Sequence, residues 1–352
     1  MVGLPVFGET SRPAVRRPVL RLSLGRGNAD EWSRAVTVVA VELGLGPAVD
    51  ALEIVTAAGE SSPAAAVGDA TSVAFGFEDD GDPQVVFTGE IAEVVRSVTR
   101  GRTIRVFGGA RVLARLRVNQ SYEQQSAGAI VRDLADRGGI DTATVDDGPD
   151  FPFYALDDRA SALDHVAALA RKSGFVAYFT SADELNFGPV AQGQAVQSFS
   201  YGQDIIALRV AEHTPGLAKV KVVGEGAASS NGGDAWAWIA KQPPTAGAGT
   251  GDPERLLSDS SLRTADAARR AAEGAIAAAA GHAGTLVVAG APLVTPTSSI
   301  EIAGCPDPSL DGPCLARTVR HRYSKHGGFT STIGFVRTGG ASGASALAGA
   351  LL

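Results

Sequence analysis

The sequence predicts a mainly β protein of the α+β class, in which two antiparallel β regions, each a barrel or sandwich, flank a small α+β domain. Alternating apolar and polar residues, the pattern of half-buried strands, recur from Val19 to about residue 108 and again beyond Gln197. Between these regions, two segments carry apolar residues at helical spacing and end at glycine. The chain has 352 residues, more than a single core usually holds, so two or three domains are expected.

The first β region is predicted to span residues 18–117. The stretch VLRLSLG places Leu20, Leu22 and Leu24 on one face, as in a half-buried strand. Further strands are expected in AVTVVAVEL, ALEIVTA and TSVAFGF, then in the long strand VVFTGEIAEVVRSV and its return TIRVFG. Residues 1–17 are rich in Pro and Arg, and we expect them to form a flexible arm.

The α+β domain is predicted at 118–190. Its helices lie in SAGAIVRDLADRGG and RASALDHVAALARKSG, and its hairpin in FVAYFT and ELNFG. Strands return in the second β region, 191–338, around a Gly/Ala-rich insertion with an Ala-rich helix at about 225–284. Within it, residues 225–253 are expected to be loops around the strand WAWI, which holds Trp236 and Trp238. Residues 339–352 are expected to be a flexible tail.

Motifs that carry chemistry are missing from the sequence. It has no phosphate-binding loop, nucleophile elbow, HExxH or zinc-deaminase signature. We therefore predict no catalytic, cofactor-binding or metal-binding residues and no cofactor. Cys305 and Cys314 flank a turn where a disulfide is geometrically possible, but free thiols suit a cytoplasmic protein better, and the sequence leaves this open.

The net charge of −7 hides a segregation of charges, with seven arginines and no acid between Glu93 and Glu123. The overall acidity and the few aromatic residues in that block argue against nucleic-acid binding. No apolar run is long enough for a transmembrane helix, so we expect no membrane insertion. The N-terminus does not read as a signal peptide, so synthesis and assembly in the cytoplasm are expected.

The stretch LDGPCLARTVRHRYSKHGGFTSTIGF, residues 310–335, gathers basic residues and two histidines but reads as a β-hairpin. Strand alternation puts Val319, His321 and Tyr323 on an apolar face and Arg320 and Arg322 on the opposite face, with His326 at the turn. Convergent catalytic groups are therefore not expected. The candidate subunit-interface residues are Arg320, Arg322, Arg111 and Arg115.

The chain resembles the late control D or baseplate hub family of contractile phage tails, which includes the hub half of the type VI spike protein VgrG. The resemblance rests on VGDATSVAFGF with VVFTGEIAEV, on SAGAIVRDLADRGGI, on RASALDHVAALARKSGFVAYFTSADELNFGP and on the closing hairpin, and covers roughly 19–338. Elements at 67–108 also recur in the same order at 295–337, which suggests a repeated architecture. The family's Pro-Gly-Asp before the second-domain strand is replaced by Thr295-Pro296-Thr297.

The resemblance implies two tube-like β domains per chain and a homotrimeric ring that joins a sixfold inner tube to a threefold spike. The implied partners are inner tube proteins on one side, a spike protein as a separate chain on the other, and further baseplate components. The particle would be a phage tail or a contractile injection system, extracellular or intracellular, assembled in a bacterial cytoplasm. The alternatives are a particle-associated cell-wall hydrolase and a carbohydrate- or peptide-binding β-module that uses Trp236 and Trp238.

Overall fold

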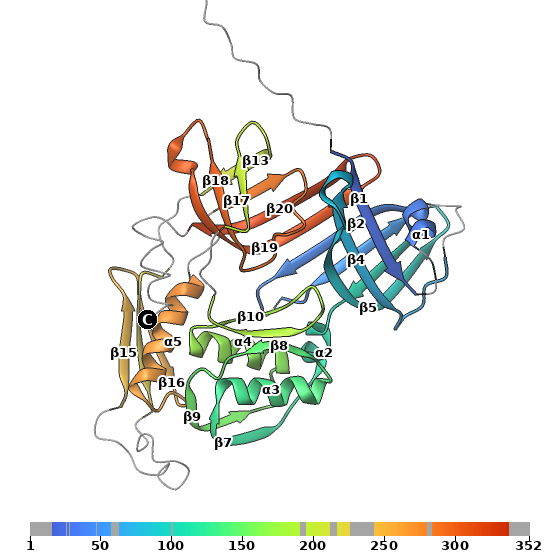
Figure 1. Ribbon diagram of the computed structural model, residues 1–352. Coiled ribbons are helices and arrows are strands. Elements are labelled where there is room, and N and C mark those ends of the chain that lie inside the picture. Colours follow the sequence, from blue (N-terminus) through green and yellow to red (C-terminus); the bar gives the residue numbers. More distant parts are fainter. Residues whose placement is uncertain are drawn as a thin grey trace, which may run out of the picture.

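The computed structural model describes residues 16–337 except 26, 28, 47, 58–62, 100, 191–194, 212–216, 226–242 and 280–283. The described part is mainly β, as predicted, and its helices other than the short α1 lie outside the large sheet (Figure 1). The WAWI segment, residues 1–15 of the expected arm and the expected tail lie outside the described residues. No helix in the described ranges is long and apolar enough to cross a membrane.

The first β-unit comes first among the described residues, and its six strands lie where the sequence predicts them. Its strands join in the order β1-β4-β5-β6-β3-β2, each antiparallel to its neighbours. Apolar residues at every second position of these strands fill the interior, where Trp32 of the one short helix is also buried. The elements are β1 (Pro18–Leu24), α1 (Ala29–Ala35), β2 (Val36–Gly44), β3 (Ala51–Thr56), β4 (Ala70–Phe77), β5 (Gln84–Ser97) and β6 (Gly101–Phe107).

The second β-unit closes the described chain. Its strands join in the order β12-β18-β19-β20-β17-β13, antiparallel except for the parallel pair β12–β18. This order matches that of the first β-unit strand for strand, which confirms the architectural repeat expected from the sequence. The elements are β12 (Gln197–Ser200), β13 (Ile205–Val210), β17 (Gly284–Val288), β18 (Ser299–Ala303), β19 (Gly312–Ser324) and β20 (Gly328–Arg337).

The two β-units share one sheet and one hydrophobic cluster. Strand β2 pairs antiparallel with β19 over Val38–Gly44 and Thr318–Ser324, which links the units into a twelve-stranded sheet. Residues of both units, among them Phe75, Phe199 and Phe335, belong to the same buried cluster. The junction between the units is therefore built like the interior of one domain.

The middle segment forms an α+β unit (Figure 1), whose buried side chains make a separate hydrophobic cluster. Both long helices follow their sequence signals, since Ser126 and Ser161 cap their N-termini and Gly139 and Gly174 end them in the left-handed conformation. The elements are α2 (Ala110–Arg115), β7 (Gln120–Ser126), α3 (Ala127–Gly138), β8 (Thr142–Val145), β9 (Asp150–Leu156), α4 (Ala162–Ser173), β10 (Val176–Phe179) and β11 (Leu185–Gly188).

The segment inserted into the second β-unit packs on the α+β unit. Its sheet contains β14 (Lys219–Gly224), β15 (Thr245–Gly249) and β16 (Glu254–Asp259), and α5 (Ala265–Ala279) lies against α4. Val220, Val222 and the buried alanines of α5 belong to the cluster of the α+β unit. A Cβ on Gly274 would lie 2.3 Å from the carbonyl oxygen of Arg171, so the helices approach closely where α4 ends.

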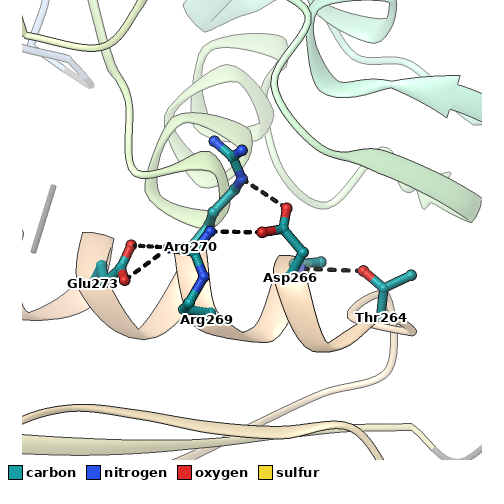
Figure 2. A network of polar contacts seen from close by, with 6 residues as sticks. Thr264, Asp266, Arg269, Arg270 and Glu273 are labelled. Carbon is teal, nitrogen blue, oxygen red and sulfur yellow. Dashed lines mark hydrogen bonds and ion pairs between the residues drawn. The ribbon is translucent and has the colours of Figure 1, made fainter. Parts of the chain in front are cut away.

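The exposed side of α5 carries a chain of ion pairs (Figure 2). Thr264 Oγ1 accepts a hydrogen bond from the Ala267 N–H, while Arg269 bonds Asp266 at 2.6 Å and Glu273 at 2.9 Å. These pairs are spaced three or four residues apart, where side chains on a helix meet. They support the helix without forming a buried site.

Several elements were not expected from the sequence. Strand β15 lies in the Gly-rich stretch predicted to be loop, and that prediction was wrong for Thr245–Gly249, whose backbone pairs with β14. Strand β7 is largely polar and has no apolar alternation, but pairs with β9. In both cases a neighbouring strand satisfies the backbone groups, and the local sequence gives little signal of it.

Candidate assembly surface on the shared sheet

Strand β19 separates its arginines from its histidine, as predicted. Val319 and His321 are buried in the core, whereas Arg320 and Arg322 are exposed on the other face of the sheet. Arg320 lies directly opposite Glu42 of β2, and its Nε is 3.1 Å from Glu42 Oε1. This ion pair bridges the two β-units, so Arg320 contacts an acid of the same chain at the unit junction.

The exposed side of the shared sheet continues into the first β-unit with further charges. Arg105 on β6 lies opposite Glu93 of β5 and Glu53 of β3, with contacts of 2.8 Å and 3.5 Å. Directly paired residues of a ladder project from the same face. Following the pairs across the sheet therefore defines one charged face, made of Glu42, Glu53, Glu93, Arg105, Arg209, Arg320 and Arg322.

His321, on the opposite face of the same sheet, is a core residue. Its Nδ1 lies 2.8 Å from Ser331 Oγ, which accepts a hydrogen bond from the Ala291 N–H at the same distance. The rings of Phe75 and Phe329 lie beside it, with centroids 6.2 Å and 5.9 Å away. Burial lowers the pKa of His321 to about 4, against a smaller opposing effect of the Val294 carbonyl, so the ring is neutral at pH 7.

The remaining reactive side chains of the described ranges do not converge on a site. His326 is exposed in the turn after β19, and Cys305 and Cys314 are buried free thiols. Burial raises the pKa of the Cys314 thiol to about 12, which keeps it protonated and unreactive. Among the described residues, no group of three or more His, Cys, Asp or Glu side chains is placed to hold a metal ion.

The other two predicted interface residues lie on a different unit. Arg111 and Arg115 belong to α2, which packs into the cluster of the α+β unit through Ala110 and Leu113. The guanidinium carbon of Arg111 is 5.6 Å from the centroid of the Phe107 ring, and Arg115 is exposed. The four predicted arginines therefore lie in two separate places, Arg320 and Arg322 on β19 and Arg111 and Arg115 on α2.

Two carboxyl groups, that of the buried Asp50 and that of the half-buried Asp183, mark the boundary between the first β-unit and the α+β unit. Asp50 Oδ1 accepts a hydrogen bond from the Gly44 N–H at 2.9 Å, and Asp183 Oδ1 accepts one from the Gly109 N–H at 2.6 Å. Burial raises the pKa of Asp50 to about 7 and that of Asp183 to about 6. The charge of Asp183 adds to the effect on Asp50, so these neighbours ionise reluctantly.

Sequence reasoning missed most of the charged face. Glu42, Glu93 and Arg209 each stand at outward positions of alternating strands, which is a signal that they share a sheet surface. Their grouping depends on which strands are neighbours, because β19 follows β2 only after more than two hundred residues of chain. Alternation alone could have found the face of each strand, but not the ion pairs between strands.

Similarity to known proteins is found in the fold. No protein-family model and no curated protein sequence matches the chain. The 43 kDa tail protein of prophage MuSo2 from Shewanella oneidensis is 15% identical with a TM-score of 0.68, covering 90% of this chain and 98% of its own. A tail protein from Neisseria meningitidis is 12% identical with a TM-score of 0.69, at 94% and 99% coverage.

A third similar structure comes from a secretion system. The c3393 protein of E. coli, a type VI secretion component described as similar to bacteriophage T4 tail proteins gp27 and gp5, is 13% identical with a TM-score of 0.55. The match covers 92% of this chain and 78% of that protein. The chain therefore has the fold of phage tail proteins and of a type VI secretion component.

Proposed function

We propose that this chain is a structural hub of a phage tail-like contractile particle. Three copies would form a ring that joins a sixfold inner tube to a threefold spike. The observation that carries the proposal is the internal repeat, in which two β-units with the same strand order are joined edge to edge through β2 and β19. Three such chains would present six similar units to the tube while keeping threefold symmetry for the spike.

Assembly into a ring would also cover strand edges that are exposed in the isolated chain. Contacts between unlike surfaces of identical chains produce either a closed ring or an open filament, according to the rotation at each contact. Unpaired strand edges otherwise promote aggregation, and closure covers them. The likeness in fold to phage tail proteins supports this reading over an enzymatic one.

The proposed partners are the inner tube proteins, a separate spike protein and other baseplate components, in a particle assembled in a bacterial cytoplasm. Arg320, Arg322, Arg111 and Arg115 are proposed as contact residues in that assembly. Arg320 and Arg322 lie on the charged face, where they would meet a neighbouring chain or line the lumen. The hub itself would have no enzymatic activity and bind no cofactor.

Light scattering on the purified chain, alone and with a spike protein from the same particle, tests the proposal. The expected mass of the hub ring is three times the chain mass of 35.8 kDa. Copurification with the tube protein is expected to depend on that ring. A chain that remains monomeric at micromolar concentration, with and without its spike partner, would overturn the proposal.

A further inference from the structure

The internal repeat aligns individual residues as well as strands. In the first hairpin Ser97 pairs with Gly101, and in the second hairpin Ser324 pairs with Gly328. Both glycines have positive φ angles, 79° and 68°, and each hairpin turn has three residues. Counting back along each strand from its turn shows which positions correspond: Glu93 corresponds to Arg320, Val94 to His321 and Val95 to Arg322. Inward and outward positions agree at these three positions, because Val94 packs against the core like His321, while Glu93 and Val95 are exposed like Arg320 and Arg322.

The two aligned strands differ in how many neighbours they have. On one side β19 pairs with β20; on the other it pairs first with β18 and then, from Thr318 to Ser324, with β2. Strand β5 pairs with β6 and, as far as Glu90, with β4. Over Glu93–Val95 the described part of the chain supplies no strand on the β4 side. The place that β2 occupies beside β19 is thus open beside β5.

A second open edge lies at the other end of the repeat. Strand β13 corresponds to β2, and within the described ranges it pairs only with β17. The shared ladder positions of β3 and β17 align Val41 of β2 with Leu208 of β13, and Glu42 with Arg209. Apolar side chains are exposed on both open edges, since Ile206 is 59% and Val95 is 43% exposed.

We propose that β13 of one chain pairs antiparallel with Glu93–Val95 of β5 in the next copy, repeating between chains the β2–β19 junction found within the chain. This inference rests on the proposed ring and names its interface. The register follows from the internal junction: Glu93 faces Arg209, Val94 faces Leu208, and Val95 faces Ala207. Ile206 is the extra residue of an irregularity in the β13–β17 ladder.

Charge complementarity supports this register. Within the chain, Arg320 of β19 faces Glu42 of β2 at the unit junction. Between chains, the corresponding positions hold Glu93 and Arg209, so the charges are exchanged and the pair stays opposite in sign. Directly opposed like charges destabilise a sheet, whereas opposite charges stabilise it by about 0.2–1 kcal/mol.

The apolar positions fit the same arrangement. Val94 and Leu208 are both partly buried and pack against the rim of the shared cluster. Facing each other across a ladder, they would continue that cluster from one chain into the next, as the buried pair of Val41 and His321 continues the core across the junction inside the chain. Because the contact joins two different edges of identical chains, each copy would use its β13 edge toward one neighbour and its β5 edge toward the other.

Cysteine cross-linking of the full chain tests the pairing. Val95→Cys with Ala207→Cys is expected to give covalent oligomers on mild oxidation or with a short bismaleimide. Each single variant alone should give none, while a mixture of the two should give only a dimer, because the interface is head-to-tail. The matched control combines Ala207→Cys with Val85→Cys, an exposed position of β5 outside the open edge, and should not cross-link. Cross-linking by a single variant, or equally by the control, would overturn the proposal.

Charge exchange provides a second readout. Glu93→Arg or Arg209→Glu alone should reduce oligomer at a fixed concentration by at least tenfold, and the double variant should restore most of it. A ring of normal mass without specific cross-links and without rescue would reject this pairing while leaving the hub function intact. A chain that is monomeric under all conditions would reject both.

Discussion

Thr297 adopts in the second β-unit the left-handed backbone conformation that Gly68 adopts in the first, with φ angles of 75° and 91°. The Gly68 N–H donates to the carbonyl of Ile91 at 2.9 Å, and the Thr297 N–H donates to the carbonyl of Ala316 at 2.8 Å. Thr297, which departs from the sequence pattern of the family that the chain resembles, therefore occupies the same turn as Gly68. Threonine thus adopts in the second β-unit the backbone conformation that glycine adopts in the first β-unit.

The residues that follow explain how the turn is kept. Asp69 Oδ2 accepts a hydrogen bond from the Ala66 N–H at 2.8 Å, and Ser298 Oγ accepts one from the Thr295 N–H at 3.0 Å. Each side chain bonds the backbone three residues earlier, as Asp and Ser do in turns. The repeated turn is thus held by its hydrogen bonds, and glycine at its centre is favourable but not required.

Thr297→Gly is expected to stabilise the protein slightly. A β-branched residue with positive φ carries a backbone penalty of about 1–2 kcal/mol, of which glycine's greater freedom in the unfolded chain cancels about half. The expected gain in the free energy of unfolding is up to about 1 kcal/mol in urea titrations. Gly68→Ala is the reciprocal control and should lose about 1–2 kcal/mol through backbone strain alone, since no atom lies within 4 Å of the added Cβ. A destabilised Thr297→Gly would show that the threonine side chain contributes more than its backbone penalty.

The sequence predicted most strands of both β-units, because alternation and turn residues agree along the chain. For β19 it also predicted which face each side chain takes, and His321, Arg320 and Arg322 lie where expected. It could not predict the β2–β19 ladder, since nothing in either strand specifies a partner so distant in sequence. For the same reason the sequence does not predict the Arg320–Glu42 pair, and it offers Arg320 only as a candidate interface residue on a face that meets water, the lumen or the next subunit.

Asp50→Asn is expected to stabilise the protein at high pH. The pKa of Asp50 in the folded protein is raised to about 7. Its contribution to the free energy of unfolding is therefore complete below its unfolded pKa near 3.8 and is lost as the pH rises through 7. The asparagine oxygen can still accept from the Gly44 N–H but carries no charge. At pH 8 the variant should be more stable than wild type by up to about 4 kcal/mol, with little difference at pH 4. Asp82→Asn, at a side chain that is 92% exposed, is the control and should leave the free energy of unfolding unchanged at both pH 4 and pH 8.

His321 should make the protein sensitive to acid. Its folded pKa is lowered to about 4, so its contribution is complete above the unfolded value of 6.5 and is lost as the pH falls through 4. The loss between these values is about 3 kcal/mol. His321→Phe places an aromatic ring among Phe75 and Phe329 and should remove that loss. Urea unfolding from pH 7 to pH 4 measures this as a change in the difference in free energy of unfolding between the variant and the wild type. An unchanged difference across this range would contradict a neutral buried histidine.

Gly274→Ala should destabilise the contact between α4 and α5. Alanine normally stabilises a helix interior by about 1 kcal/mol over glycine. Here the new Cβ would lie 2.3 Å from the Arg171 carbonyl oxygen, so the helices must separate, at a net cost of about 1–3 kcal/mol. Thermal unfolding measures the effect, and Gly247→Ala, whose Cβ would meet nothing closer than 3.4 Å, is the control. A gain in stability at Gly274 would mean that α5 does not approach α4 so closely.

Arg320→Glu with Arg322→Glu should weaken assembly while the chain remains folded. The Arg320–Glu42 pair is 56% and 62% exposed, so reversing it should cost less than about 1 kcal/mol of stability. The charged face, however, becomes predominantly acidic where a ring would meet a neighbouring chain or its tube and spike partners. Circular dichroism should be unchanged, while trimers and particles seen by light scattering and electron microscopy should decrease at least tenfold. The control reverses two exposed arginines on other units, Arg159→Glu with Arg255→Glu, and should assemble normally. If the Arg320 and Arg322 variant also assembles normally, the charged face has no role in assembly, and the contacts must lie on the strand edges alone.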